Sequence, residues 1–399
     1  MKRRILIVAE AVTLAHVARP LALAKILEGL GHEVVVACSP SARRWFDAEG
    51  RGFEPIESIS QERFLKSLYM GKPLYNTAML RRYVEADVAL MDRVCPDVVI
   101  GDFRLSLHVS TKLCKLPYGA VTNAYWSPKY FQYAQVPDIP LTRAVGIKVA
   151  DILFRVAYRP AFAWHARAYS ETARYFGVAP ASGGLLGAYT ASDCTAYADV
   201  AEFYNATNDD SSHELFLGPL LWSPKNQLPK GAERWGTSRP LIYVTLGSSG
   251  SPHVAAKVLA ALADLSVDVF IATAEATIDH LPANAMALDY APGDVLCQRA
   301  TLVIGNGGSP ITYQALAAGK PVLGLASNFD QFLNMHRVEA LGAGRCLRAA
   351  DALDGDIRAA TVELTNEPAF RIAAERARLA IAASDVPAPV KNWLRQLVA

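Results

Sequence analysis

Apolar and polar positions in the first half of the chain alternate between two patterns. Continuous apolar runs occur at residues 4–10 (RILIVAE), 32–38 (HEVVVAC) and 97–103 (DVVIGDF). Between the first two runs, the segment ARPLALAKILEGL repeats its apolar residues with the period of a helix. Uninterrupted Val and Ile runs are typical of strands that are covered on both faces. The pattern therefore predicts a parallel sheet with helices on either side.

The same alternation begins again after Pro240. The segment LIYVTLGSSG predicts a strand followed by a glycine turn, HVAAKVLAALADL a helix, and VDVFIATA a second strand. Further strands are predicted at residues 284–291, 300–308 and 320–326, with a helix before the last of them. Residues 216–240 are rich in Pro, Gly and charged residues, which is typical of an interdomain linker.

These patterns predict an α/β fold built from two doubly wound, Rossmann-like domains. We expect an N-terminal domain at residues 1–222, a linker at 223–239 and a C-terminal domain at 240–380. Residues 381–399 are predicted to form a helix that returns toward the first domain. Two such domains facing each other would leave a cleft between the carboxyl ends of their strands, where ligands bind in folds of this kind.

Composition narrows the class of protein. The 399 residues include 40 Lys or Arg and 38 Asp or Glu, so the net charge of +2 offers no electrostatic basis for binding nucleic acid. The six cysteines are scattered without a CxxC pair, which favours buried thiols in a reducing cytoplasm over disulfides or a metal site. The start, MKRRILIVAEAV, resembles a signal peptide, but Glu10 interrupts the apolar run and a first buried strand is our interpretation.

One stretch, GNGGSPITYQALAAG at residues 305–319, predicts an anion site. It follows a buried strand, and Ser309 is expected to cap a helix that has Pro310 at its first position and ends at Gly319. Glycines let a phosphate approach the backbone, and a helix start presents unpaired N–H groups. A ligand-free turn between strand and helix explains these glycines equally well.

Two further features favour a ligand in the second domain. TLGSSG at residues 245–250 is another glycine and hydroxyl turn after a strand. SNFDQFLN at 327–334 places Asp330 beside Gln331, and this pair can hold several sugar hydroxyls at once. The alternative for Asp330 is a simple cap of the helix that follows.

The sequence resembles the family-one-type nucleotide-sugar glycosyltransferases of the GT-B fold. The resemblance is carried by residues 305–344, by TLGSSG, by LDYAP at 288–292, by AHVARPLALAKILEGLGHEVVVA at 15–37, and by LFLGPLLW at 215–222. It covers both domains, with weak correspondence only around 125–215. It implies a donor, a UDP- or TDP-sugar, as co-substrate, with no other cofactor and no metal.

The resemblance also implies a set of site residues. The family's general base matches His16 and its acidic partner matches Asp102, which would orient the imidazole during inverting transfer. The donor sugar would be held by Asp330 and Gln331, and the base by Tyr290 and Ala291. The donor phosphates would be held by Gly247, Ser248, Ser249, Asn306, Gly307, Gly308, Ser309 and Thr312.

Several positions depart from the family pattern. The histidine that contacts phosphate in the family is Asn306 here, and the hydroxyl part of the turn is replaced by Pro310 and Ile311. The usual glutamate of the helix is Gln314. An asparagine amide still donates to a phosphate oxygen but carries no charge. The DGD sequence at 354–356 resembles a metal motif of another glycosyltransferase fold, but a turn and helix cap is the better interpretation.

The acceptor is the least determined part of the prediction. Tyr125 and Trp126 follow a strand of the first domain, where they could stack on a flat or apolar acceptor or simply pack in the core. Residues 141–174 mix basic and apolar side chains. We interpret them as a helical layer of the first domain, the alternative being contact with an anionic membrane.

We therefore expect an inverting transferase that acts on a small-molecule hydroxyl or amine. Two alternatives stay open: a transferase of the same fold with a lipid-linked acceptor at the membrane, and a non-catalytic nucleotide-binding homologue. The sequence indicates no oligomeric state.

Overall fold

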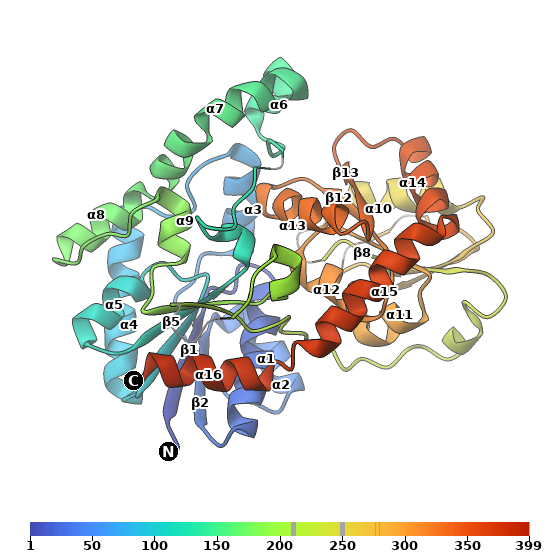
Figure 1. Cartoon of the computed structure of the whole chain (residues 1–399). Helices are drawn as coiled ribbons and strands as arrows, with labels where there is room; N and C mark the ends of the chain where they lie inside the picture. The colour runs from blue at the N-terminus through green and yellow to red at the C-terminus, as the bar shows by residue number, and fades with distance from the viewer. Residues whose placement is uncertain (134, 209–212, 248–251, 276, 279, 399) are drawn as a thin grey trace. The chain divides into compact units, whose positions relative to one another are not determined.

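The chain forms two compact units, each built around its own sheet (Figure 1). The computed structural model describes residues 1–133, 135–208, 213–247, 252–275, 277–278 and 280–398. Unit 1 comprises Met1–Leu220 together with Ser384–Ala399, and unit 2 comprises Leu221–Ala383. All recorded strand pairs in both sheets are parallel, so the predicted α/β class with two Rossmann-like domains is confirmed. The cleft between the domains stays a prediction.

Unit 1 contains a seven-stranded sheet in the order β3-β2-β1-β4-β5-β6-β7. The strands are β1 (Arg4–Ala9), β2 (Glu33–Cys38), β3 (Glu54–Pro55), β4 (Val98–Asp102), β5 (Tyr118–Thr122), β6 (Cys194–Tyr197) and β7 (Glu214–Phe216). The helices are α1 (Ala15–Gly29), α2 (Arg43–Ala48), α3 (Gln61–Met70), α4 (Thr77–Val94), α5 (Leu107–Cys114), α6 (Pro140–Val145), α7 (Ile147–His165), α8 (Arg167–Tyr175), α9 (Gly184–Tyr189) and α16 (Pro387–Leu397).

Alternating side chains cover the two faces of this sheet. Leu6, Val8 and Val99 point to one face, where they pack against apolar residues of α4 and α5. On the other face, α1 contacts β1 and α16 contacts β6. The strands are therefore buried on both sides, as continuous apolar runs predict.

Unit 2 contains a six-stranded sheet in the order β10-β9-β8-β11-β12-β13. The strands are β8 (Leu241–Thr245), β9 (Asp268–Ala272), β10 (Ala285–Leu288), β11 (Leu302–Gly305), β12 (Val322–Ala326) and β13 (Gly344–Arg348). The helices are α10 (Pro252–Leu262), α11 (Gly293–Arg299), α12 (Ser309–Ala317), α13 (Phe329–Ala340), α14 (Asp354–Asn366) and α15 (Pro368–Ala383). Apolar residues of α10 and α14 pack on one face of the sheet, and α11 and α12 contact β8 and β11.

Each sheet reverses its strand order at one place. In unit 1 this topological switch lies between β1 and β4, where Ala9 pairs with Asp102. In unit 2 it lies between β8 and β11, where Thr245 pairs with Gly305. The loops at such a point lead away to opposite sides of the sheet, which leaves a crevice beyond the strand ends. A ligand site is therefore expected at the residues that follow these four strands.

The chain end packs back onto unit 1 through α16 (Figure 1). The indole of Trp393 is fully buried, and its Nε1 donates a hydrogen bond to the carbonyl of Cys194 at 3.1 Å. Gly119 in β5 makes this approach possible, because a Cβ at that position would lie 2.4 Å from Cζ2 of Trp393.

We expect Gly119→Ala to lower the free energy of unfolding of unit 1 by about 1–3 kcal/mol, since the added methyl group meets a buried ring. Gly52→Ala is the matched control, because nothing lies within 4 Å of a Cβ there. Urea unfolding followed by tryptophan fluorescence measures both. The loss in free energy of unfolding caused by Gly119→Ala should be smaller when Trp393 is replaced by Leu. Equal losses at the two glycines would contradict the packing described.

Candidate active site

The structure brings His16 and Asp102 together at the switch point of unit 1. Asp102 is the last residue of β4 and is 2% exposed. His16 lies in the first turn of α1, which begins three residues before the helical segment that the sequence predicted. The imidazole Nδ1 is 2.9 Å from Oδ1 of Asp102. When Nδ1–H donates to the carboxylate, Nε2 carries the lone pair and can accept a proton.

A second cation from the same helix faces Asp102. Arg19 lies one turn after His16, and its Nη1 is 3.4 Å from Oδ1 of Asp102. Its Nη2 donates to Oδ1 of Asn123 at 3.1 Å, and the Asn123 amide donates in turn to Asp199. Burial raises the pKa of the Asp102 carboxyl, but the charges of Arg19 and His16 outweigh it, so this pKa lies below its ordinary value of 3.8. The arrangement keeps a buried carboxylate ionised beside the imidazole.

An aromatic wall adjoins the imidazole. The ring of Phe103 stacks on His16 at 4.5 Å between centroids, and Tyr189 stacks on the other side of Phe103 at 4.9 Å. Trp126 meets Tyr189 edge-on at 5.3 Å. Phe103 has a φ of 59°, a strained conformation for a bulky residue that persists only when the surroundings hold it. Of the two aromatic residues predicted for the acceptor, Trp126 belongs to this wall, whereas Tyr125 is buried in the core.

In unit 2, the predicted phosphate turn lies at the start of α12. Gly308 is the N-cap and Ser309 is already helical, so the predicted cap at Ser309 is wrong by one residue. Oδ1 of Asn306 accepts a hydrogen bond from the Gly308 N–H at 3.0 Å. Its Nδ2 lies 3.2 Å from the position of a Cβ on Gly247, so the two glycine turns are neighbours. Ser248 and Ser249, also predicted to contact phosphate, lie outside the described residues.

Thr312 has a structural role that differs from the predicted one. Its hydroxyl donates to the carbonyl of Ser309 at 3.0 Å and accepts from the amide of Asn334 at 2.9 Å. The side chain is 1% exposed, and its single O–H proton is therefore already used. Asn334 also donates to the carbonyl of Gly307, and so fixes the turn from α13. Gly307 itself has a φ of 79°, and a Cβ there would lie 2.7 Å from Met335.

The predicted sugar clamp lies in the first turn of α13. Asn328 caps this helix by accepting from the Gln331 N–H at 3.1 Å, so the cap is not Asp330. Oε1 of Gln331 accepts from the N–H groups of Ser327 and Asn328, which leaves the Nε2 end as a donor. Of the predicted base-binding pair, Ala291 is buried, and the carbonyl of Tyr290 accepts from Asn226 at 2.9 Å.

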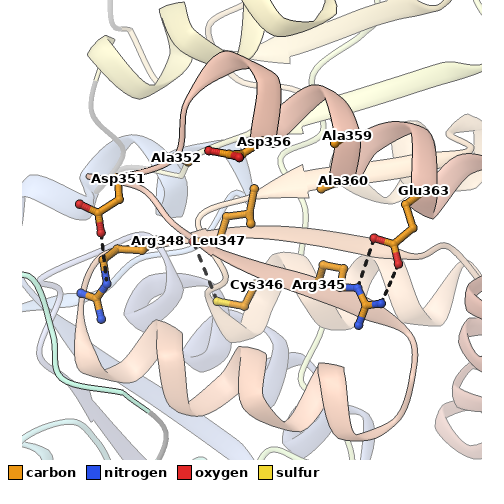
Figure 2. A pocket seen from close by; sticks show the side chains of 10 residues that line it. All are labelled: Arg345, Cys346, Leu347, Arg348, Asp351, Ala352, Asp356, Ala359, Ala360 and Glu363. Carbon is orange, nitrogen blue, oxygen red and sulfur yellow. Dashed lines mark hydrogen bonds and ion pairs between the residues drawn. The ribbon is translucent and has the colours of Figure 1, made fainter. Parts of the chain in front are cut away.

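A separate pocket of about 670 Å³ lies between β13 and α14 (Figure 2). Four of the charged side chains that line it form two ion pairs, Arg345 with Glu363 at 2.6 Å and Arg348 with Asp351 at 3.8 Å. None of the predicted site residues lines it.

The DGD sequence lies at the start of α14, where Asp356 accepts from the Leu353 N–H, so it caps the helix as predicted. Within the described part of the chain, no group of three His, Cys, Asp or Glu residues is arranged to hold a metal ion.

Comparison with known proteins decides the family. A profile described as "Erythromycin biosynthesis protein CIII-like, C-terminal domain" matches residues 256–397. The chain is 42% identical over 377 residues to a PGL/p-HBAD biosynthesis glycosyltransferase of Mycobacterium tuberculosis (strain ATCC 25177 / H37Ra), a match that covers 94% of this chain and 88% of the relative. It is 40% identical to a PGL/p-HBAD biosynthesis rhamnosyltransferase of Mycobacterium bovis (strain BCG / Pasteur 1173P2), covering 99% and 88%. This chain belongs to the family-one-type GT-B glycosyltransferases.

Solved structures agree with this fold. Spinosyn forosaminyltransferase SpnP superimposes with a TM-score of 0.71 at 18% identity, covering 100% of both chains. Spinosyn rhamnosyltransferase SpnG complexed with thymidine diphosphate has a TM-score of 0.68 at 18% identity, covering 98% of this chain and 100% of that one. This protein is thus a GT-B glycosyltransferase with two Rossmann-like domains.

Sequence reasoning missed three residues around the imidazole of this glycosyltransferase. Arg19 was assigned only to an apolar helix, and Phe103 and Tyr189 were given no role. Phe103 follows Asp102 directly in the sequence, so a position close to the site was predictable for it. Nothing in the sequence signals the orientation of Arg19 or the stacking of Tyr189, because both depend on the packed structure.

In an Arg19→Gln variant we expect the pKa of Asp102 to rise, because burial is then opposed by His16 alone. The stability that the depressed pKa contributes is fully present above pH 3.8 and is lost as the pH falls through the lower folded-state pKa. The variant loses part of that contribution at neutral pH. Carbon-13 NMR of labelled Asp carboxyls measures the pKa, with Arg345→Gln as the control. An unchanged Asp102 titration would show that Arg19 does not act on this carboxylate.

Proposed function

We propose that this glycosyltransferase moves a 6-deoxyhexose from a thymidine-diphosphate sugar to a hydroxyl of a small aromatic acceptor, with inversion at the anomeric carbon. The observation that carries the proposal is the 2.9 Å contact between Nδ1 of His16 and Oδ1 of Asp102 at the switch point of unit 1. It supports a polarised imidazole with Nε2 ready to accept a proton.

The proposed reaction is a single displacement. Nε2 of His16 takes the proton of the acceptor hydroxyl as its oxygen attacks the anomeric carbon. The bond from that carbon to the diphosphate oxygen breaks on the opposite side, and the nucleoside diphosphate leaves with the bonding electrons. Asp102 stabilises the imidazolium that forms, as in other His–Asp pairs. Arg19 acts as a positioning residue, because it keeps the Asp102 carboxylate ionised.

Unit 2 supplies the proposed donor site. The N–H groups at the start of α12, the flexible backbone at Gly247 and Gly307, and the Asn306 amide would hold the diphosphate. The leaving group would thereby gain the stabilisation that metal ions supply in other transferases. Asp330 and Nε2 of Gln331 would bind sugar hydroxyls, and the Tyr290–Ala291 segment the base.

The choice of nucleotide and sugar in this proposal rests on the relatives and structural neighbours. A relative that is 40% identical over 99% of this chain is named a rhamnosyltransferase, and a neighbour in fold was solved with thymidine diphosphate. Uridine diphosphate is the alternative nucleotide. We place the reaction in the cytoplasm, which the six free cysteines support.

The proposal of an aromatic acceptor rests on the aromatic wall that adjoins the imidazole. Phe103 and Trp126 are half-buried and lie on the same side of unit 1 as the imidazole, linked through Tyr189. A flat ring would gain stacking energy against such side chains, and its hydroxyl would point toward Nε2. We therefore assign Trp126, and not the buried Tyr125, to acceptor binding.

His16→Ala should lower the transfer rate by about 10²–10⁴, the range for removal of a general base, and leave donor binding nearly unchanged. His213→Ala is the matched control, since His213 is an exposed histidine of the same unit. Transfer is measured by product formation with thymidine-diphospho-rhamnose and a phenolic acceptor. Wild-type rates in the His16 variant would refute the assignment of the base.

Asp330→Ala should weaken binding of the thymidine-diphosphate sugar by about 1.5–3 kcal/mol, as for a lost hydrogen bond to a charged group, and leave thymidine diphosphate itself almost unaffected. Asp354→Ala, at the exposed start of α14, is the control. Calorimetric titration with both ligands separates the sugar from the nucleotide. A flat wild-type titration with thymidine and uridine diphosphates would overturn the donor site altogether.

A further inference from the structure

Helix α7 (Ile147–His165) packs on the rest of unit 1 through one side only. Phe154, Tyr158 and Phe162 lie on that inner side, one helical turn apart. Tyr158 stacks on Phe131 at 5.5 Å, and Phe162 meets Trp126 at 6.4 Å. The inner side therefore adjoins the aromatic wall beside His16.

The outer side of α7 is apolar and exposed. Val156 is 82% exposed and Ile152 is 67% exposed, while Val149, Leu153 and Trp164 are each about half exposed. The first four of these residues along the chain repeat at the i, i+3, i+4 and i+7 positions and form one row, and Trp164 lies further along the same side, beyond Pro160. Figure 1 shows α6 and α7 at the outside of unit 1. We call this row the outer face of α7.

Basic side chains flank the outer face along one edge. Lys148, Arg155 and Arg159 follow one another at four-residue or seven-residue intervals between the inner and outer sides. Residues 141–175 contain six Lys or Arg and two Asp or Glu, a local charge of +4 against +2 for the whole chain. Both acids are already engaged within unit 1, Asp151 by Tyr133, the Val136 N–H and Arg155, and Glu171 by Thr77 and Arg167.

We propose that the outer face of α7 is a docking surface for an anionic lipid bilayer. An amphipathic helix of this kind lies in the plane of the interface, with apolar side chains among the acyl chains and basic side chains at the headgroups. Trp164, at the end of the row, is of the type enriched at that boundary. None of the described helices is long and apolar enough to cross a membrane.

Charge favours a bilayer over a second copy of the chain. An apolar row alone would fit either partner, but two outer faces packed with antiparallel helices would bring their basic flanks together and repel. A surface of negative headgroups complements these side chains instead, at about a five-fold gain in affinity for each Lys or Arg near the surface. The proposal does not depend on the identity of the donor or acceptor.

Vesicle flotation tests the proposal, because floating vesicles separate bound protein from aggregates. We expect the wild-type chain to float with phosphatidylcholine vesicles that contain about 30% phosphatidylglycerol, and to be released as salt screens the charges. It should stay unbound with pure phosphatidylcholine. Equal binding to both vesicles, or binding to neither, would overturn the proposal.

Variants separate the apolar and basic contributions. Ile152→Asp with Val156→Asp should abolish flotation, whereas Leu379→Asp, at a 56% exposed position of α15, should leave it unchanged. Lys148→Gln with Arg159→Gln should weaken binding about 25-fold, the product of two five-fold losses. These positions are exposed, and circular dichroism verifies that each variant is folded.

Two results would assign the face to another partner or deny its role. Light scattering that shows a wild-type dimer, lost in the Ile152→Asp and Val156→Asp variant without any vesicle binding, would assign the outer face to a second copy. Flotation that survives this double substitution would place the membrane contact elsewhere. Donor titration of the same variant should match the wild type, so failure of the donor site and failure of the docking surface are distinguishable.

Discussion

A buried negative charge organises unit 1. Asp102 ends a central strand with almost no access to water, and a lone carboxylate in such a place would take up a proton instead of staying charged. One turn of α1 prevents this by directing both His16 and Arg19 at the same oxygen. Arg19 also donates to Asn123, the residue after β5, so this one carboxylate is connected through α1 to the end of a third strand.

A second buried ionic group lies at the same end of the same two strands. Glu10 follows β1, and its carboxylate meets Arg104, which follows β4 and also pairs with Asp87. All these side chains are withdrawn from solvent, and burial raises the pKa of Glu10 despite the nearby arginine. Removing one partner of such a group typically costs about 3–5 kcal/mol, because the other charge is left buried. The loops at the switch point are thus held by paired charges, which explains how Phe103, between Asp102 and Arg104, keeps a strained backbone.

The two units have different residues at their switch points. Unit 1 has the charged side chains of Asp102 and Arg19 beside His16, where we propose that a proton is transferred. Unit 2 has glycines and a helix start at its switch point, where Asn334 and Thr312 use their hydrogen bonds to shape the turn that we propose as the phosphate site. Asn306 also serves the turn, because its Oδ1 accepts a hydrogen bond from the Gly308 N–H. Side chains that the sequence suggests as ligands can therefore serve the loop itself.

The order of apolar runs determined the two parallel sheets, because continuous Val and Ile segments such as those in β1 and β4 are stable only when covered on both faces. The resemblance to the family, and not the apolar pattern, implied that Asp102 orients the imidazole of His16, and the structure places the two side chains 2.9 Å apart. Arg19 lies in an apolar stretch whose sequence looks like plain helix core, and its role depends on β5 bringing Asn123 within reach. The outer face of α7 shows the same limit, since its apolar residues have the pattern of a core helix and only the packed structure decides which side stays in water. Local pattern specifies elements and strand ends, whereas the direction of a side chain depends on neighbours that are distant in sequence.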